Sequence, residues 1–236
     1  MKAIFYDASA TMLQKNHLPI VKNILEKKQN FISVFVSNEM SSNIYSDSNK
    51  ICENNLLKVN NSSYVKLKTF KHNEISQFIK RERPNFVFIG AYRIYDQLIT
   101  AICNKENINV YNIQHGFEID SVNFVSSIIL SRLKKGIRLL NASVNLGLIS
   151  HKNPIFVSYQ YIVHILGGKS FKNTLLDNPL FHPTTFFVYS EYYKDFWFNK
   201  YGLDKKKMSI ITPPDFLMID EISKQKKENG CCYIAQ

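Results

Sequence analysis

The stretch NFVFIGAYRIYDQLITAICNKENINVYNIQHG (85–116) decides the fold that the sequence predicts. Residues 85–90 and 108–113 are short runs of aliphatic and aromatic residues, which are typical of buried strands. The segment between them, 93–106, carries apolar residues at helical spacing: Ile94, Leu98, Ile99 and Ile102. A strand, a helix of this length and a second strand predict a βαβ unit, in which the two strands lie parallel in one sheet.

Similar segments precede and follow this unit. Residues 2–7 and 31–37 have the composition of strands, and the apolar residues between them predict a helix over 12–28. Strand patterns resume at 185–190 and in MSIITPPDF (208–216). Strands that alternate with helices in this way predict an α/β fold, with a Rossmann-like parallel sheet and flanking helices.

The remaining segments are marked by their boundary residues. Pro154 opens a helix that Gly167 closes, and Ser190 caps an aromatic helix that Gly202 ends. Residues 38–63 are rich in Asn and Ser, and we expect loops there around a short strand at LLKVN.

We expect one main domain over 1–219, with a basic helical insert at about 121–176. The insert holds seven Lys or Arg residues and no Asp or Glu. A charged linker follows at 220–230, and CCYIAQ (231–236) has the pattern of the first strand of a second domain, which the sequence truncates.

The composition is that of a globular protein with an excess of positive charge. The chain has 236 residues, of which 45% are apolar, and its formal net charge is +11. Its four cysteines have no C-x-x-C spacing, which favours a reducing cytoplasm. A positive charge of this size indicates an anionic partner, and we expect a polyanionic ligand or the inner membrane surface, where the protein would be peripheral. Nucleic acid is the weaker alternative, and we expect no such partner, because no stacking motif, zinc module or helix-turn-helix is present.

The segment VYNIQHGFEID (110–120) holds the candidate catalytic residues. His115, Glu118 and Asp120 follow a strand directly, and ligands of open α/β sheets bind beyond the carboxyl ends of the strands. A histidine there can act as a general base, because its ordinary pKa lies near neutral pH. The alternative is a half-buried histidine bound to a backbone carbonyl. Asp7, at the end of the first predicted strand, is a candidate substrate-binding residue for the same reason.

Other motifs give no site. No glycine-rich phosphate loop follows the first strand, and GGKS (167–170) lacks a glycine where Val163 stands, so it does not match a phosphate loop. The six histidines show no metal-ligand spacing. We therefore expect neither a metal nor a bound cofactor.

Residues 85–118, FFVYSEYYKDFWFNKYGLDKKKMSIITPPDF (186–216) and CCYIAQ resemble the N-terminal half of bacterial GT-B glycosyltransferases that build capsule and lipopolysaccharide, including the Kdo and sialic-acid transferases. The resemblance implies transfer of a sugar from a nucleotide-sugar donor to a glycan or lipid-linked acceptor, in a cleft between two Rossmann-like domains. This domain would hold the acceptor. The family's nucleotide site lies mainly in the second domain, so a C-terminal domain or partner subunit would be needed for activity. One departure is Pro213, which replaces a glycine of the family pattern.

The residues that carry this resemblance take roles from it. Gln114, His115 and Gly116 match the family's Gln-His-Gly, with His115 as the implied base or donor-phosphate contact and the other two as substrate-binding residues. The basic insert would bind an anionic acceptor or the membrane through four residues: Arg132, Lys134, Lys135 and Arg138.

Two other functions remain open from the sequence. The first is a non-catalytic Rossmann-like module, or a truncated remnant, that recognises an anionic glycan or lipid. The second is a nucleotide-sugar 2-epimerase, since those enzymes share the two-domain architecture. Product analysis with a nucleotide sugar separates transfer from epimerisation.

Overall fold

The computed structural model describes residues 1–38, 46–67, 71–114, 140–167 and 178–212. Seven strands form one parallel sheet in the order β3-β2-β1-β4-β5-β6-β7. Their bounds are β1 (Lys2–Asp7), β2 (Ile32–Asn38), β3 (Ser62–Leu67), β4 (Phe86–Ile89), β5 (Asn109–Ile113), β6 (Thr185–Val188) and β7 (Met208–Ile210). This is the strand order of a Rossmann-like sheet, and the order in which the chain adds strands reverses between β1 and β4. The predicted fold class is therefore confirmed.

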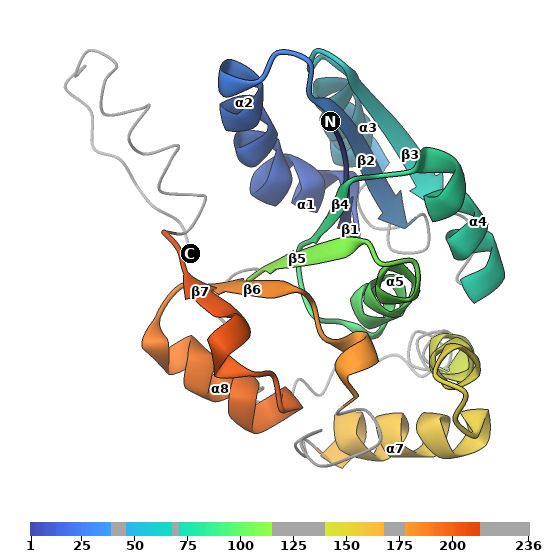
Figure 1. The fold of residues 1–236 in the computed structure, drawn as a ribbon. Helices are drawn as coiled ribbons and strands as arrows, with labels where there is room; N and C mark the ends of the chain where they lie inside the picture. Colours follow the sequence, from blue (N-terminus) through green and yellow to red (C-terminus); the bar gives the residue numbers. More distant parts are fainter. Residues whose placement is uncertain (39–45, 68–70, 115–139, 168–177, 213–236) are drawn as a thin grey trace.

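Helices cover both faces of the sheet (Figure 1). One face carries α1 (Ala10–Met12), the π-helical turn η1 (Leu13–His17), α2 (Leu18–Lys27) and α3 (Ser46–Leu57). The opposite face carries α4 (His72–Glu82) and α5 (Ile94–Lys105). Beyond them along the chain come α7 (Pro154–Gly167), α8 (Glu191–Tyr201), which packs on β6, and the short 3-10 helices η3 (Pro179–Phe181) and η4 (Lys205–Lys207).

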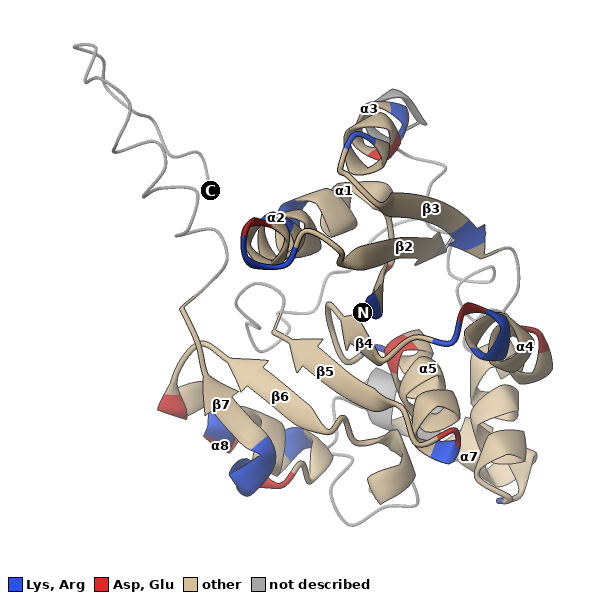
Figure 2. Ribbon diagram, turned by 45° about the horizontal axis from the view of Figure 1, so that its top comes forward, with Lys and Arg blue, Asp and Glu red and all other residues tan. Residues whose placement is uncertain are grey.

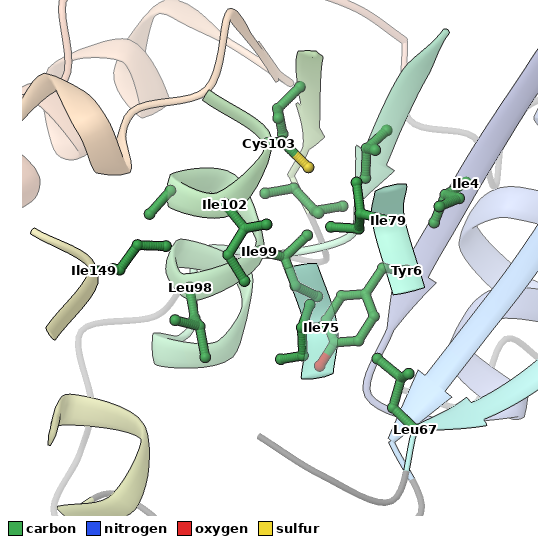
Figure 3. Close-up of a cluster of buried hydrophobic side chains, with 14 of the residues drawn as sticks. Ile4, Tyr6, Leu67, Ile75, Ile79, Leu98, Ile99, Ile102, Cys103 and Ile149 are labelled. Carbon is green, nitrogen blue, oxygen red and sulfur yellow. The ribbon is translucent and has the colours of Figure 1, made fainter. Parts of the chain in front are cut away.

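The alternation of side chains along β1 explains the two-sided core. Ala3 and Phe5 lie in the cluster formed with α1, η1, α2 and α3, whereas Ile4 and Tyr6 lie in the cluster formed with α4 and α5. Figure 3 shows the second cluster, in which Tyr6 lies among isoleucines of α4 and α5. On the other face, the Phe5 and Phe88 rings stack with centroids 4.9 Å apart, which ties β1 to β4.

A third layer lies outside α5. A helix over 140–149 and the helix α7 form it, and we call residues 140–167 the outer helical layer. Leu146, Ile149 and Val157 of this layer are buried in the same cluster as Leu98 and Ile102 of α5. Figure 3 shows Ile149 beside Leu98 and Ile102.

The structure confirms several predicted boundaries. The helix α5 falls within 93–106, α7 begins at Pro154, and α8 begins after its cap Ser190. Gly202 ends α8 with φ at 73°, a left-handed conformation that glycine adopts without strain.

The prediction for 38–63 was wrong over 46–63, while residues 39–45 lie outside the described residues. Where loops and a short strand at LLKVN were expected, the helix α3 runs through Leu57 and the strand β3 begins only at Ser62. Polar residues dominate α3, but Leu56 is fully buried in the core cluster of that face, and Cys52 packs against the same cluster. The helix is therefore stabilised by tertiary contacts that the local pattern does not reveal. The linker and the second-domain strand expected at 220–236 lie outside the described residues.

Candidate functional site

The chain adds strands β2 and β3 on one side of β1 and strands β4 to β7 on the other, so the strand order reverses where β1 and β4 lie side by side (Figure 1). A crevice outside the carboxyl ends of the strands at such a point is where open α/β sheets bind ligands. In this chain β1 ends at Asp7, and β4 is followed by Gly90 and then by Arg93 at the start of α5. These residues form a polar cluster, which we call the switch-point network.

Asp7 is at the centre of this network and has no exposed surface. Its Oδ1 accepts a hydrogen bond from the Ala8 backbone N–H at 2.6 Å and another from Arg93 Nη2 at 2.8 Å. Its Oδ2 accepts a hydrogen bond from Asn16 Nδ2 at 3.2 Å. Both oxygens therefore have partners, as a buried carboxylate requires.

Arg93 joins Asp7 to a second buried carboxylate. Its Nε donates to Asp96 Oδ2 at 2.8 Å, and its Nη2 also lies 3.3 Å from Asp96 Oδ1. The backbone N–H of Arg93 donates to Asp96 Oδ2 at 2.7 Å, so Asp96 holds both the backbone and the side chain of this residue. The Asp7 and Asp96 side chains are fully buried, whereas the Arg93 side chain is 38% exposed.

The π-helical turn η1 places two more residues of the network. Asn16 and His17 lie in this turn and are buried, and His17 Nε2 lies 3.6 Å from Asp7 Oδ2. That distance is longer than a well-formed hydrogen bond. Single π-helical turns inside α-helices occur frequently at functional sites.

Gly90 allows β4 to approach this cluster. A Cβ atom at position 90 would lie 2.1 Å from Asp7 Oδ2 and 3.0 Å from His17 Nε2. No side chain fits in that space without a shift of the network, so only glycine is compatible with this arrangement.

The network perturbs the acid–base equilibria of its members. Burial by itself would raise the pKa of Asp7, but the contact with His17 and the positive charge of Arg93 outweigh it, and the pKa is held well below its usual range. Burial by itself would lower the pKa of Arg93, but the charges of Asp96 and Asp7 raise it. Both shifts favour the charged forms, so Asp7 and Arg93 form an ion pair at neutral pH.

Gln114 lies at the same edge, after β5. It is buried, its backbone N–H donates to the Phe187 carbonyl at 2.9 Å, and its Oε1 accepts from the Tyr189 N–H at 3.2 Å. These bonds fix the end of β5 against the end of β6. Its assignment as a substrate-binding residue stays a prediction, as does that of Asp7.

The other predicted site residues lie outside the described residues. They are His115, Gly116, Glu118, Asp120, Arg132, Lys134, Lys135 and Arg138. The sequence analysis did not identify Arg93, Asp96, Asn16 or His17. One available signal was Asp96, an acidic residue among the apolar residues of a predicted buried helix.

The described residues contain no group of three or more His, Cys, Asp or Glu side chains that could hold a metal ion. Among them there is also no helix with the length and hydrophobicity needed to cross a membrane.

Comparisons with known proteins show similarity of fold alone. No protein-family model matches the chain, and no curated protein matches it. A putative UDP-N-acetylglucosamine 2-epimerase from Listeria monocytogenes is 13% identical, with a TM-score of 0.38 over 92% of this chain and 70% of that one. The UDP-GlcNAc 2-epimerase from Methanocaldococcus jannaschii is 15% identical, with a TM-score of 0.36 over 94% of this chain and 76% of that one.

A second group of similar structures matches a smaller part of the chain. The Bordetella bronchiseptica enzyme WbmH, solved in complex with NAD+, is 13% identical, with a TM-score of 0.34 over 48% of this chain. The match spans 38% of the length of WbmH.

Proposed function

We propose that this chain is the acceptor-side Rossmann-like domain of an enzyme that acts on nucleotide sugars. The observation that carries the proposal is the switch-point network, which gathers ionised and polar side chains at the edge where open α/β sheets bind ligands. Gln114, the last described residue before His115, is fixed at the same edge by β6. The resemblance to the GT-B glycosyltransferases supplies the substrate class.

The reaction that we propose is glycosyl transfer. His115 acts as the general base that takes the proton from an acceptor hydroxyl, with Glu118 and Asp120 beside it in the sequence. The acceptor oxygen then attacks the anomeric carbon of the donor, and the bond from that carbon to the nucleotide phosphate breaks. Gln114 and Gly116 place the acceptor, and the four basic residues of the insert hold its anionic part: Arg132, Lys134, Lys135 and Arg138.

Product analysis tests this proposal. The protein, purified in the form that its native cells produce, is incubated with a panel of nucleotide sugars with and without glycan acceptors. We expect an elongated acceptor and a free nucleotide, and we expect both to be lost in His115→Ala while the fold is retained. A C2-epimer of the nucleotide sugar would identify an epimerase instead. Neither turnover nor binding of any nucleotide sugar would contradict the proposal and favour the non-catalytic module.

We also propose that the domain contacts an anionic membrane surface through the outer helical layer. The helix α7 contains no charged residue, and Figure 2 shows it without acidic or basic positions. Among the residues of α7 whose burial the structure describes, the exposed ones are apolar or aromatic: Ile155 is 80% exposed, Tyr159 64% and Phe156 46%. This apolar surface belongs to the predicted insert, whose sequence holds seven Lys or Arg residues and no Asp or Glu; apolar and cationic residues together are the composition of helices that lie on anionic lipid.

A further inference from the structure

The guanidinium of Arg93 has N–H donors that the described residues do not use. The Nε–H is bound to Asp96, and Nη2 is shared between Asp7 and Asp96. Arginine has five N–H donors, and the two on Nη1 have no partner among the residues that the structure describes. Among the three charged side chains Arg93, Asp7 and Asp96, only that of Arg93 reaches solvent: it is 38% exposed, and the two carboxylates are fully buried.

The charge of the network restricts what Nη1 can bind. Asp7 and Asp96 contribute two negative charges and Arg93 one positive charge, so the sum is negative. Even with a protonated His17, 3.6 Å from Asp7, the cluster would be neutral rather than cationic. A phosphate that approached Nη1 would meet two buried carboxylates that water screens poorly. An uncharged oxygen accepts the same hydrogen bond without that repulsion.

We propose that Arg93 Nη1 donates hydrogen bonds to an uncharged oxygen of the ligand, a hydroxyl or carbonyl group of a sugar, at the carboxyl edge of β1 and β4. The inference rests on the proposed function for the identity of the ligand as a sugar. Arg93 is then a ligand-binding residue, and Asp7 and Asp96 are positioning residues. They hold the guanidinium in one orientation before the ligand arrives, so little freedom is lost on binding.

A purely structural role for Arg93 predicts a different response to ligands. If Arg93 only links β1 to α5, then neither a sugar nor a phosphate changes its environment. If it were a phosphate site, inorganic phosphate would compete with the sugar. Titration with a sugar and with phosphate therefore distinguishes three roles for Arg93: sugar binding, phosphate binding and a purely structural link.

Nitrogen NMR of the arginine side chains makes this test on the unmodified chain. With ¹⁵N-labelled arginine, we expect N-acetylglucosamine to shift the Arg93 side-chain signals saturably, and inorganic phosphate at matched ionic strength to leave them in place. No shift with the sugar, or a shift with phosphate at lower concentration than with the sugar, would overturn the inference. Arg81, which is 71% exposed and pairs with Glu82, is the internal control and should respond to neither.

A variant gives the second measurement. Arg93→Lys keeps a cation beside Asp7 but removes the planar fork, so it cannot bind both carboxylates and donate to a ligand. We expect it to remain folded and to lose at least about tenfold in sugar affinity, or about 1.4 kcal/mol. Arg81→Lys should bind as the unmodified chain does. An unchanged affinity in folded Arg93→Lys would overturn the inference; if this variant does not fold, the NMR titration decides alone.

Failure of this inference differs from failure of the proposed function. Turnover of a nucleotide sugar with Arg93 signals that do not respond to any sugar overturns only the role of Arg93. A sugar response at Arg93 without turnover or binding of any nucleotide sugar overturns only the proposed function.

Discussion

The switch-point network and the outer helical layer place polar and apolar side chains in opposite ways. The network buries the side chains of Asp7 and Asp96 completely and links both to Arg93. The outer helical layer contains one basic residue, Lys152, and no acidic one, yet Ile155 is 80% exposed. Hydrophobicity alone would expose the two carboxylates and bury the isoleucine. The difference shows that tertiary position decides burial in each region. The strand order brings Asp7 and Arg93 together and buries the carboxylate, whereas the outer helical layer packs on α5 with one side and exposes apolar residues on the other.

The largest expected effect comes from adding one carbon to the network. In Gly90→Ala the new Cβ meets Asp7 Oδ2, and the free energy of unfolding should fall by about 3 kcal/mol or more, because a buried ion pair must shift. Urea denaturation measures the loss. In an Asp7→Ala background the clashing oxygen is gone, so Gly90→Ala should lower the free energy of unfolding by clearly less than it does in the unmodified chain. Equal costs in both backgrounds would mean that Gly90 is required for another reason.

A smaller loss is expected from removing the guanidinium. Arg93→Ala leaves two buried carboxylates without their cation, and we expect about 2–3 kcal/mol of destabilisation. This is less than for a fully buried pair, because the Arg93 side chain is 38% exposed and partly screened. The matched control is Arg81→Ala, whose side chain is 71% exposed and should cost about 1 kcal/mol or less. Similar losses in the two variants, measured by thermal and chemical unfolding, would contradict the account of the network.

The network should also govern stability in acid. The pKa of Asp7 is lowered in the folded protein, so below the ordinary aspartate pKa of about 3.9 the unfolded chain takes up the proton first. The stabilisation is therefore present above that pH and is lost as the pH falls. Between about pH 5 and pH 1, unfolding of Asp7→Asn should depend less steeply on pH than unfolding of the unmodified chain. A slope unchanged by the substitution would show that Asp7 titrates alike in both states.

The smallest effect on stability belongs to the outer helical layer. Because Ile155 is exposed, Ile155→Glu should change the free energy of unfolding by no more than about 0.5 kcal/mol. It should nevertheless reduce sedimentation with anionic liposomes, and the binding of the unmodified chain should weaken as salt rises. Ile51→Glu is the matched control, since Ile51 is 62% exposed on α3, on the opposite side of the molecule from α7 (Figure 1). Liposome binding that is absent, insensitive to salt, or reduced equally by both substitutions would refute the membrane proposal.

The strands and most helix boundaries follow from local sequence, because a buried strand such as β4 is apolar and a helix end such as Gly202 needs a particular residue. The helix α3 could not be foreseen, because its sequence is mostly polar and its contacts with the core, through Leu56 and Cys52, are made in the tertiary structure. The position of Asp7 at the end of the first strand was predicted from the sequence and is confirmed. Its pairing with Arg93 was not predicted, because 86 positions separate the two residues and only the adjacency of β1 and β4 joins them.

Hydrogen exchange with and without a saturating neutral sugar tests the central claim most directly: ligand chemistry belongs to the carboxyl edge of the sheet and not to the outer helical layer. Amides of residues 7–9 and 90–93 should become protected when N-acetylglucosamine binds, and amides of 140–159 should exchange as before. Protection confined to 140–159, or none at the sheet edge although the sugar is bound, would contradict the account.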